Sequence, residues 1–444
     1  MIRNTLFFFV FHFAASFALI VQSAATVTFK LQQCIDYALE NNLSVRQSVL
    51  NTEIIKVTSN QLRLSRFPSV DASARHNFAW SDAQSATDGS WAYDGSTSQS
   101  FGINASLNLF NGLRTYRSIQ QADTEYQAGL LNTETQRDNL KLQVLAAYTQ
   151  VLYAMQQLEN AKRQLEVTQV QLNQAAERLQ VGSIAKADYL QVSTQLAQEQ
   201  LTLTNARSLL ATNRITLMQL MEYPVNNTFE IVQPDMSELV VPTTVPAASD
   251  VYQLAQQQKP QVKQASLNNQ VALFDIDLAK ASALPSLALD AGVSTNYTDK
   301  VQQLNYGSQL QHNLTPSLGL TLSIPIFTQG KTKSQVSQAQ IRSEITKLDG
   351  HNTLNQLRKN IENACLDVST SSAEYLSANQ QCLSAQASFD QAQERFAKGV
   401  IGTVDYLVQK TNLINAESSV LQARYNLIYS LKTLDFYSGN PITF

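Results

Sequence analysis

The chain repeats itself at a constant separation of 217 positions, and this internal repeat constrains the fold more than any other feature. Glu177–Gly182 recurs with partial identity as Glu394–Gly399, and Asp188–Leu190 recurs as Asp405–Leu407. A single offset that relates motifs along most of the chain indicates a duplicated structural unit. The chain is therefore expected to consist of two similar halves.

A proline-rich segment separates the two halves. We place the first repeat at residues 26–221, an equatorial linker at 222–248 and the second repeat at 249–444. The linker is marked by Pro224, Pro234, Pro242 and Pro246. Each repeat should contain, in order, a helix, two strands, a very long helix and a helix about half as long.

The expected bounds of these elements follow from the hydrophobic periodicity of each half. In the first half, a helix is expected at 31–66, strands at about 69–80 and 99–110, and helices at 113–180 and 186–221. In the second half, a helix is expected at 249–283, strands at about 286–297 and 316–327, and helices at 331–397 and 403–437.

The four expected strands alternate apolar and polar residues with a period of two. Each run of about a dozen residues is close to the ~9–11 that cross a bilayer when the strand is tilted. Aromatic residues lie toward the run ends, as an interfacial girdle requires: Trp80, Phe110, Tyr297 and Phe327. The connecting loops, 81–98 and 298–315, are polar and should face water. A soluble sandwich with one buried face is the alternative.

The long helices carry a seven-residue repeat. Residues 113–180 contain no proline, and at ~1.5 Å per residue this stretch reaches ~100 Å. One seam position holds large apolar residues such as Val144, Val151 and Leu158, and the other holds small ones: Ala147, Ala154, Ala161, Thr168 and Ala175. Strict heptad spacing predicts coiled-coil packing, and the small residues allow close approach of neighbouring helices.

The first residues have the order of a secretory signal peptide, which we place at residues 1–25. Arg3 precedes an apolar run from Leu6 to Val21, and small residues follow at 23–25. This run is shorter than the ~20 apolar residues that a spanning helix needs. No later stretch is long and apolar enough for a membrane helix, which leaves a soluble protein or a barrel.

The composition argues against several classes of function. A formal charge of −3 offers no basic patch for nucleic acid. After the signal the histidines are His76, His312 and His351, too scattered for a metal-ligand set. No glycine-rich phosphate loop and no Ser/His/Asp constellation can be placed. We therefore expect no enzymatic activity, no cofactor and no bound metal.

Four membrane strands cannot form a closed barrel alone. Unpaired strand edges cost several kcal/mol per backbone group in lipid, and about eight strands are the minimum for closure. Two copies would supply eight strands and three would supply twelve. The expected fold is mainly α with a membrane β-barrel, in which long helices continue the barrel as a tube. Such an assembly is a conduit.

The chain resembles the TolC family of outer-membrane efflux and secretion channels over essentially its whole mature length. The resemblance rests on the duplication, on the two Gly-to-Asp turns, and on these segments: Ala38–Leu43, Phe67–Ser69, Leu109–Gly112 and Ile326–Gly330. It implies a homotrimer with a twelve-stranded barrel in the outer membrane and a helical tube across the periplasm. It also implies docking onto a periplasmic adaptor protein and an inner-membrane pump.

The resemblance places the functional positions at the periplasmic turns. Gly182 and Gly399 end the long helices, where a left-handed C-cap explains glycine and where the family meets its adaptor. Asp188 and Asp405 begin the shorter helices and suit the positive end of the helix dipole. By resemblance, Asp188 matches a latch aspartate and Asp405 an acidic ring at the pore entrance.

The chain departs from the family pattern at the gate. Ile401 stands at the latch arginine position, Phe396 at its aromatic partner, and Val408 where a second acidic ring would fall. We therefore expect the closed state to be held by apolar contact around Phe396 and Ile401. Arg178 and Arg395 are expected either to pair with Asp188 or Asp405, or to lie on a solvated helix face.

Two other functions remain open from the sequence. One is a rigid periplasmic coiled-coil scaffold that binds partners without conducting. The other is a secreted, soluble coiled-coil binding protein. The cargo is also open, because drugs, metal ions, small metabolites and secreted proteins all pass through this architecture.

Overall fold

The computed structural model describes residues 27–84, 89–224, 229–234, 240–301 and 303–443. The expected signal peptide lies outside these residues. The strands are β1 Val27–Phe29, β2 Ser69–Gln84, β3 Trp91–Asn111, β4 Phe229–Ile231, β5 Ser286–Thr298 and β6 Thr315–Ser323. The helices are α1 Leu31–Asn41, α2 Leu43–Leu64, α3 Arg114–Gln180, α4 Lys186–Met221, α5 Ala248–Gln258, α6 Pro260–Ala281, α7 Tyr306–His312, α8 Lys331–Ala397 and α9 Thr403–Tyr437.

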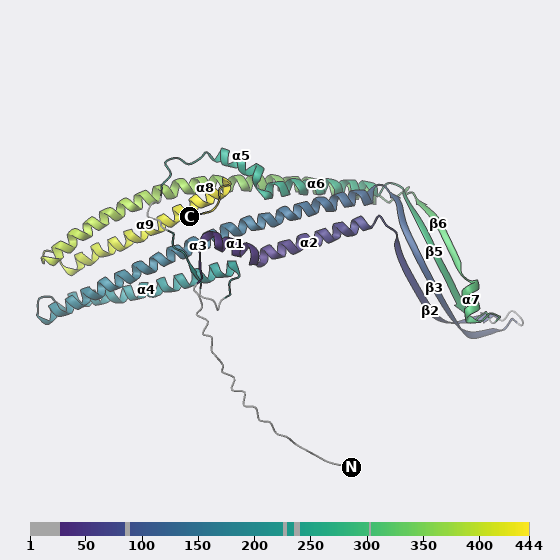
Figure 1. Ribbon diagram of the computed structural model, residues 1–444, viewed down its shortest axis with the longest axis horizontal. Coiled ribbons are helices and arrows are strands. Elements are labelled where there is room, and N and C mark those ends of the chain that lie inside the picture. Colours follow the sequence, from purple (N-terminus) through teal and green to yellow (C-terminus); the bar gives the residue numbers. More distant parts are fainter. Residues whose placement is uncertain (1–26, 85–88, 225–228, 235–239, 302, 444) are drawn as a thin grey trace, which may run out of the picture.

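The molecule is an elongated array of helices with a sheet at one end (Figure 1). The first repeat contributes the helical hairpin α3/α4, and the second contributes the hairpin α8/α9. Both hairpins point away from the sheet and end in free tips (Figure 1). Each half thus has the duplicated order of helices, two strands, a long helix and a shorter helix.

The first helix of each half is broken, and the expectation of single helices at 31–66 and 249–283 was wrong. α1 and α2 are separated at Asn42, whose extended backbone and side chain cap the second helix. α5 and α6 are separated at Lys259, and Pro260 begins α6 at the position where its missing N–H is not needed. The corresponding breaks support the common ancestry of the two halves.

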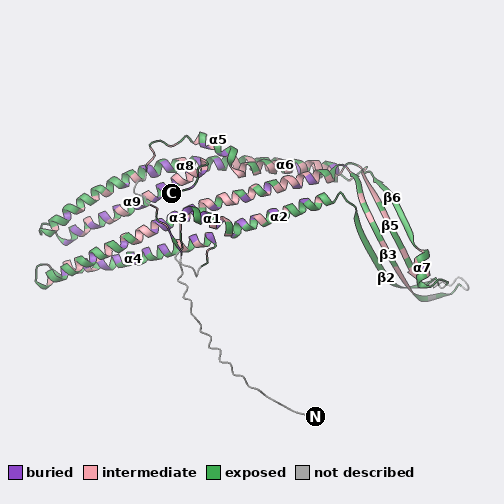
Figure 2. Cartoon of the chain, in the orientation of Figure 1, coloured by how far each residue is buried: buried purple, intermediate pink, exposed green. Residues whose placement is uncertain are grey.

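The two long helices have the bounds that the heptad pattern favoured, and their seams are packed as expected. Ala147, Ala154, Ala161, Thr168 and Ala175 are all buried on α3. On α8, the small seam residues Ala364, Ser371, Ala378 and Ala392 are buried as well. Small side chains at these positions allow the close helix approach that a coiled coil needs. Figure 2 shows buried residues at intervals along helices whose other residues are intermediate or exposed.

The main core lies midway along the molecule. It is built from α1, α3, the end of α4 and the end of α9, with Val144, Leu145, Val151 and Leu152 fully buried at its centre. The short parallel pair β1–β4 covers this core, and Tyr148 donates a hydrogen bond of 2.7 Å to the carbonyl of Val232 beside it. A second cluster under α5 contains Leu357, Ile361 and Val368. These clusters fix both hairpins at their bases.

One four-stranded antiparallel sheet, in the order β2-β3-β5-β6, joins the two halves through β3 and β5. β2 and β3 are longer than expected because pairing continues from Trp80↔Gly95 to Gln84↔Trp91. β6 ends at Ser323, short of the expected 327, two residues before Pro325, which has no N–H for a ladder. Within the described residues, one edge of β2 and one edge of β6 are unpaired.

The strand register gathers apolar residues on one face of the sheet. Val70 pairs with Ala105, Ala105 with Ala291, and Ala291 with Leu318, which gives an apolar row across all four strands. The neighbouring row is polar or small: Asp71, Asn104, Gly292 and Ser317. No second sheet covers the apolar face in the described chain, and Leu318 is 76% exposed. The sheet therefore does not have the buried face of a sandwich.

No helix in the described part of the chain combines the length and apolar character needed to cross a membrane.

Candidate functional site at the hairpin tips

The two hairpin turns have the same backbone geometry. Gly182 and Gly399 both adopt left-handed conformations, with φ of +73° and +71°. After each glycine, the next N–H donates to a carbonyl in the last helical turn: Ser183 N to Arg178 O and Val400 N to Arg395 O, both at 2.8 Å. This is the Schellman ending of a helix. A Cβ at either glycine would meet nothing within 4 Å, so only the backbone conformation favours glycine there.

The two aspartates that begin the shorter helices have different surroundings. The carboxylate of Asp188 accepts a hydrogen bond of 3.3 Å from the Ala185 N–H and so caps the start of α4. Asp188 also lines a cleft between the two hairpins. Asp405 lies in the first turn of α9 and is exposed. The structure thus places Asp188 inside the tip region and Asp405 on its surface.

Neither arginine forms the expected ion pair with Asp188 or Asp405 among the described residues. The guanidinium carbon of Arg178 lies 6.0 Å from the ring centroid of Phe396, close enough for a cation–π contact. Arg395 is exposed at the end of α8. Arg178 therefore reaches across to the second hairpin, whereas Arg395 has the solvated position that was the alternative.

The aromatic residues at the tip form a stack. Phe396 lies 4.7 Å from Tyr406 between ring centroids, with an interplanar angle of 21°, and Phe389 lies 5.5 Å from the same tyrosine. Tyr406 is buried, and that burial raises its pKa, while its hydrogen bond from Gln171 opposes the shift. Ile401 is half-buried in the turn and does not line the cleft. Of the two expected gate residues, only Phe396 lies at the contact between the hairpins.

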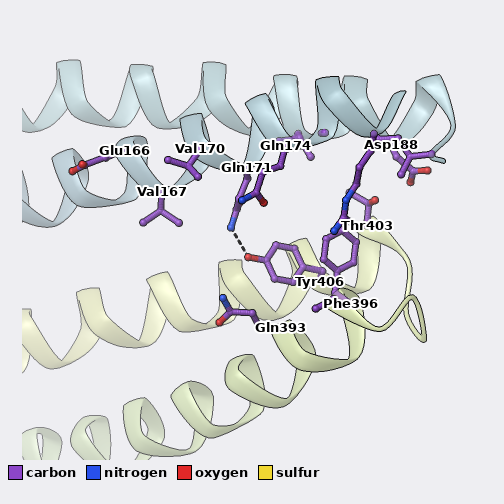
Figure 3. A pocket seen from close by; sticks show the side chains of 15 residues that line it. Glu166, Val167, Val170, Gln171, Gln174, Asp188, Gln393, Phe396, Thr403 and Tyr406 are labelled. Carbon is purple, nitrogen blue, oxygen red and sulfur yellow. Dashed lines mark hydrogen bonds between the residues drawn. The ribbon is translucent and has the colours of Figure 1, made fainter. Parts of the chain in front are cut away.

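The cleft between the hairpins has a volume of about 440 Å³ (Figure 3). Its walls come from α3 and α4 on one side and from α8 and α9 on the other. Val167, Val170 and Phe396 supply apolar surface, and Gln171 bonds the hydroxyl of Tyr406 across the gap (Figure 3). The cleft is a junction between the two repeats and lies next to both turns.

The sequence pattern of the family described as Outer membrane efflux protein matches residues 34–221 and 251–440, one match in each repeat. The chain belongs to this outer membrane efflux family. It is 23% identical to the outer membrane efflux protein BepC of Brucella suis over 337 residues, 76% of this chain and 71% of that protein. It is 26% identical to the outer membrane protein TolC of Vibrio cholerae over 343 residues, 76% of this chain and 75% of that protein.

The fold of this efflux-family chain is similar to solved structures of outer membrane channels. The outer membrane channel CmeC of Campylobacter jejuni superposes with a TM-score of 0.78 at 20% identity, covering 93% of this chain and 87% of that one. Membership in the efflux family makes the protein an outer-membrane export channel that extends into the periplasm. The hairpin tips lie at the opposite end of the molecule from the sheet (Figure 1).

This efflux-family member also has a buried ion pair near the hairpin tips that was not expected from the sequence. Glu199 on α4 and Lys410 on α9 form an ion pair with 3.2 Å between Oε1 and Nζ. Both side chains are almost fully buried. The signal that could have revealed them is heptad spacing: Glu199 follows Val192 and Leu196 in the buried seam of α4, where a charge is unusual.

Proposed function

We propose that the protein works as a homotrimer whose three sheets close into a twelve-stranded barrel in the outer membrane. The observation that carries this proposal is the apolar face of the sheet, which no second sheet covers in the described chain and which is flanked there by unpaired edges on β2 and β6. In lipid, such edges must pair with neighbouring copies, because open edges are too costly there. The apolar row through Val70 and Leu318 would face lipid, and the polar row through Asp71 and Ser317 would face the lumen.

The four long helices of each copy would continue this barrel as a periplasmic tube. At ~1.5 Å per residue, the 67 residues of α3 span ~100 Å. The tube would meet a periplasmic adaptor protein and an inner-membrane pump at the hairpin tips. The turns at Gly182 and Gly399 would contact the adaptor, and Asp188 and Asp405 would lie near the entrance. The cargo would be small molecules or secreted proteins.

Cell fractionation and channel recording test this function. The protein should extract with outer membranes, run as a heat-sensitive trimer, and conduct ions when reconstituted in planar bilayers. Recovery as a soluble periplasmic monomer would overturn the proposal. A trimer that never conducts would instead support the non-conducting scaffold.

Adaptor contact at the turns is tested separately by photo-crosslinking. A photoreactive residue at Ser183, exposed beside Gly182, should capture a periplasmic protein in cells that contain the adaptor and pump. The matched control is the same probe at Gln99, on β3 in the sheet and remote from the tips. Equal capture from both positions would contradict a specific contact at the turns.

A further inference from the structure

We propose that the buried ion pair between Glu199 and Lys410 clamps the two helical hairpins of one protomer together and keeps the periplasmic entrance narrow. The proposal rests on the channel function above and adds a closing device at residues that the family comparison does not single out. Glu199 belongs to the first repeat and Lys410 to the second, so the pair bridges the duplication.

The two charges are shielded from water and fully partnered. Their side chains are only 6% and 3% exposed. Thr168, in the seam of α3, accepts a hydrogen bond from Lys410 and donates one to Glu199, so a third helix joins the pair. Gln195 donates to the other side of the carboxylate at 3.0 Å. This satisfaction of both ions is what makes a buried pair tolerable.

Besides this pair, the described hairpins are joined by a few polar contacts, among them Gln171 to Tyr406. α9 is the helix of the second hairpin that packs on α3 and α4. Among the described residues, no other ion pair joins the two hairpins, and the remaining polar contacts include Gln157 to Ser418 at 3.3 Å and Gln164 to Glu417 at 3.4 Å. One helical turn closer to the tip, Tyr406 carries the contact to Phe396 and the cleft. The ion pair thus holds α9 against α3 and α4 one helical turn farther from the tip than the contacts of Tyr406.

A buried pair of this kind favours one spacing of the helices. Moving α9 away from α3 and α4 separates opposite charges in a medium of low dielectric, unless water enters to hydrate them. Removing one partner favours separation of the hairpins. The remaining charge is buried without a partner while the hairpins are together, and it becomes hydrated when they separate. Each single substitution should therefore shift the entrance toward the open state.

Three variants distinguish a clamp from a general loss of structure. Lys410→Met and Glu199→Gln each leave one buried charge unpaired, and both should raise the open fraction of the reconstituted channel by about tenfold or more. The exchanged pair E199K/K410E restores opposite charges at the same place and should return conductance toward the wild-type value. Lys398→Met is the matched control, because its pair with Glu394 is 4.0 Å long and exposed at the same tip.

A distance measurement tests the clamp without relying on conductance. A nitroxide label at Val400, in the second turn, reports the separation of that turn between copies, and a label at Ser183 reports the first turn. Cys365 and Cys382 are replaced by Ser for this purpose, and Cys34 is buried. In Lys410→Met, the distances from position 400 should become longer and broader, with a smaller change at 183.

The outcomes are distinguishable. Absence of any distance between labels in the wild-type protein would contradict the proposed oligomer. Wild-type distances that stay unchanged in both single variants, or a charge exchange that opens the channel as far as the single variants do, would overturn the clamp. Restoration by the exchanged pair supports it, because a purely structural defect would not be repaired by reversing two charges.

Discussion

The ammonium nitrogen of Lys259 lies 3.3 Å from the ring centroid of Phe436. It also donates a hydrogen bond of 3.0 Å to the Phe436 carbonyl and lies 3.8 Å from the carboxylate of Asp138. Lys259 is the residue at which α5 and α6 separate, and Phe436 is near the end of α9. One side chain therefore ties the helix break of the second repeat to the last turn of its final helix.

This position of Lys259 predicts a pH-dependent stability. Burial lowers the pKa of Lys259 to about 8, although the charge of Asp138 opposes the shift. Between pH 8 and 10.5, Lys259 therefore binds more protons in the unfolded chain than in the folded one. The contribution of this group to the free energy of unfolding rises with pH across that window, by up to about 3 kcal/mol. Thermal unfolding of the purified oligomer should show a smaller rise with pH in Lys259→Met than in wild type.

The control for this experiment is Lys263→Met, which removes an exposed lysine in the first turn of α6, four residues after Lys259. Its unfolding midpoints should follow those of the wild type at every pH. If Lys259→Met and Lys263→Met change with pH in parallel, the burial of Lys259 is not the cause of the dependence.

Asn42 predicts a stability difference between two neighbouring asparagines. Its side-chain oxygen accepts from the Ser44 N–H at 2.9 Å and its amide donates to the Leu220 carbonyl at 2.9 Å, so it caps α2 and binds the end of α4. Asn42→Ala should cost about 1–3 kcal/mol, because it removes a cap and leaves a carbonyl without its donor. Asn41→Ala should cost less, since the Asn41 side chain bonds only within its own helix. Equal midpoints for the two variants would contradict this role.

The glycines at the two strand-to-helix junctions should differ in their tolerance to alanine. Gly112 and Leu113 before α3, and Gln329 and Gly330 before α8, all have left-handed backbones. A Cβ at Gly112 would lie 2.8 Å from the Leu284 Cβ, whereas one at Gly330 would meet nothing within 4 Å. Gly330→Ala should cost only the backbone strain, about 1–2 kcal/mol, and Gly112→Ala should cost more or block assembly of the proposed trimer. Comparable thermal midpoints and trimer yields would show that the junction of the halves can adjust.

Much of this fold follows from local patterns. The heptads of α3 and α8 and the two-residue alternation of the strands are visible in the sequence, because each depends on residues close in the chain. The offset between repeats then places both hairpins. The break at Asn42 was missed although an asparagine before a helix is a capping signal, because apolar periodicity continues through it. Pro260, which begins α6, was missed for the same reason.

Contacts between residues far apart in the chain could not be predicted from such local patterns. The β1–β4 pair joins three residues at the start of the described chain to three in the linker, and such short strands carry no pattern of their own. Ser81 and Asp82 extend β2 although neither is apolar, because their partners on β3 continue the ladder. Heptad spacing places Glu199 in the seam of α4, but only the packing of α4 against α9 shows that Lys410 is buried beside it.

The placement of Phe396 and Ile401 predicts which of the two controls the entrance. Phe396 stacks on Tyr406 and lies beneath the guanidinium of Arg178, whereas Ile401 is outside the cleft. An aromatic pair contributes about 0.5–1.5 kcal/mol beyond its buried area. Phe396→Ser should therefore raise the closed-state conductance about two- to tenfold, because it removes the stack that holds Tyr406 within the second hairpin and also the cation–π contact of Phe396 with Arg178 of the first hairpin.

Ile401→Ser is the matched comparison, and it should change conductance less than Phe396→Ser. Phe396→Leu should lie between wild type and Phe396→Ser, because leucine keeps apolar contact with Tyr406 but not the ring stack. Single-channel records of the three variants at the same voltage and salt give the ranking. A larger effect from Ile401→Ser would place the constriction at the turn itself, since that side chain has no part in the stack that joins α8 to α9.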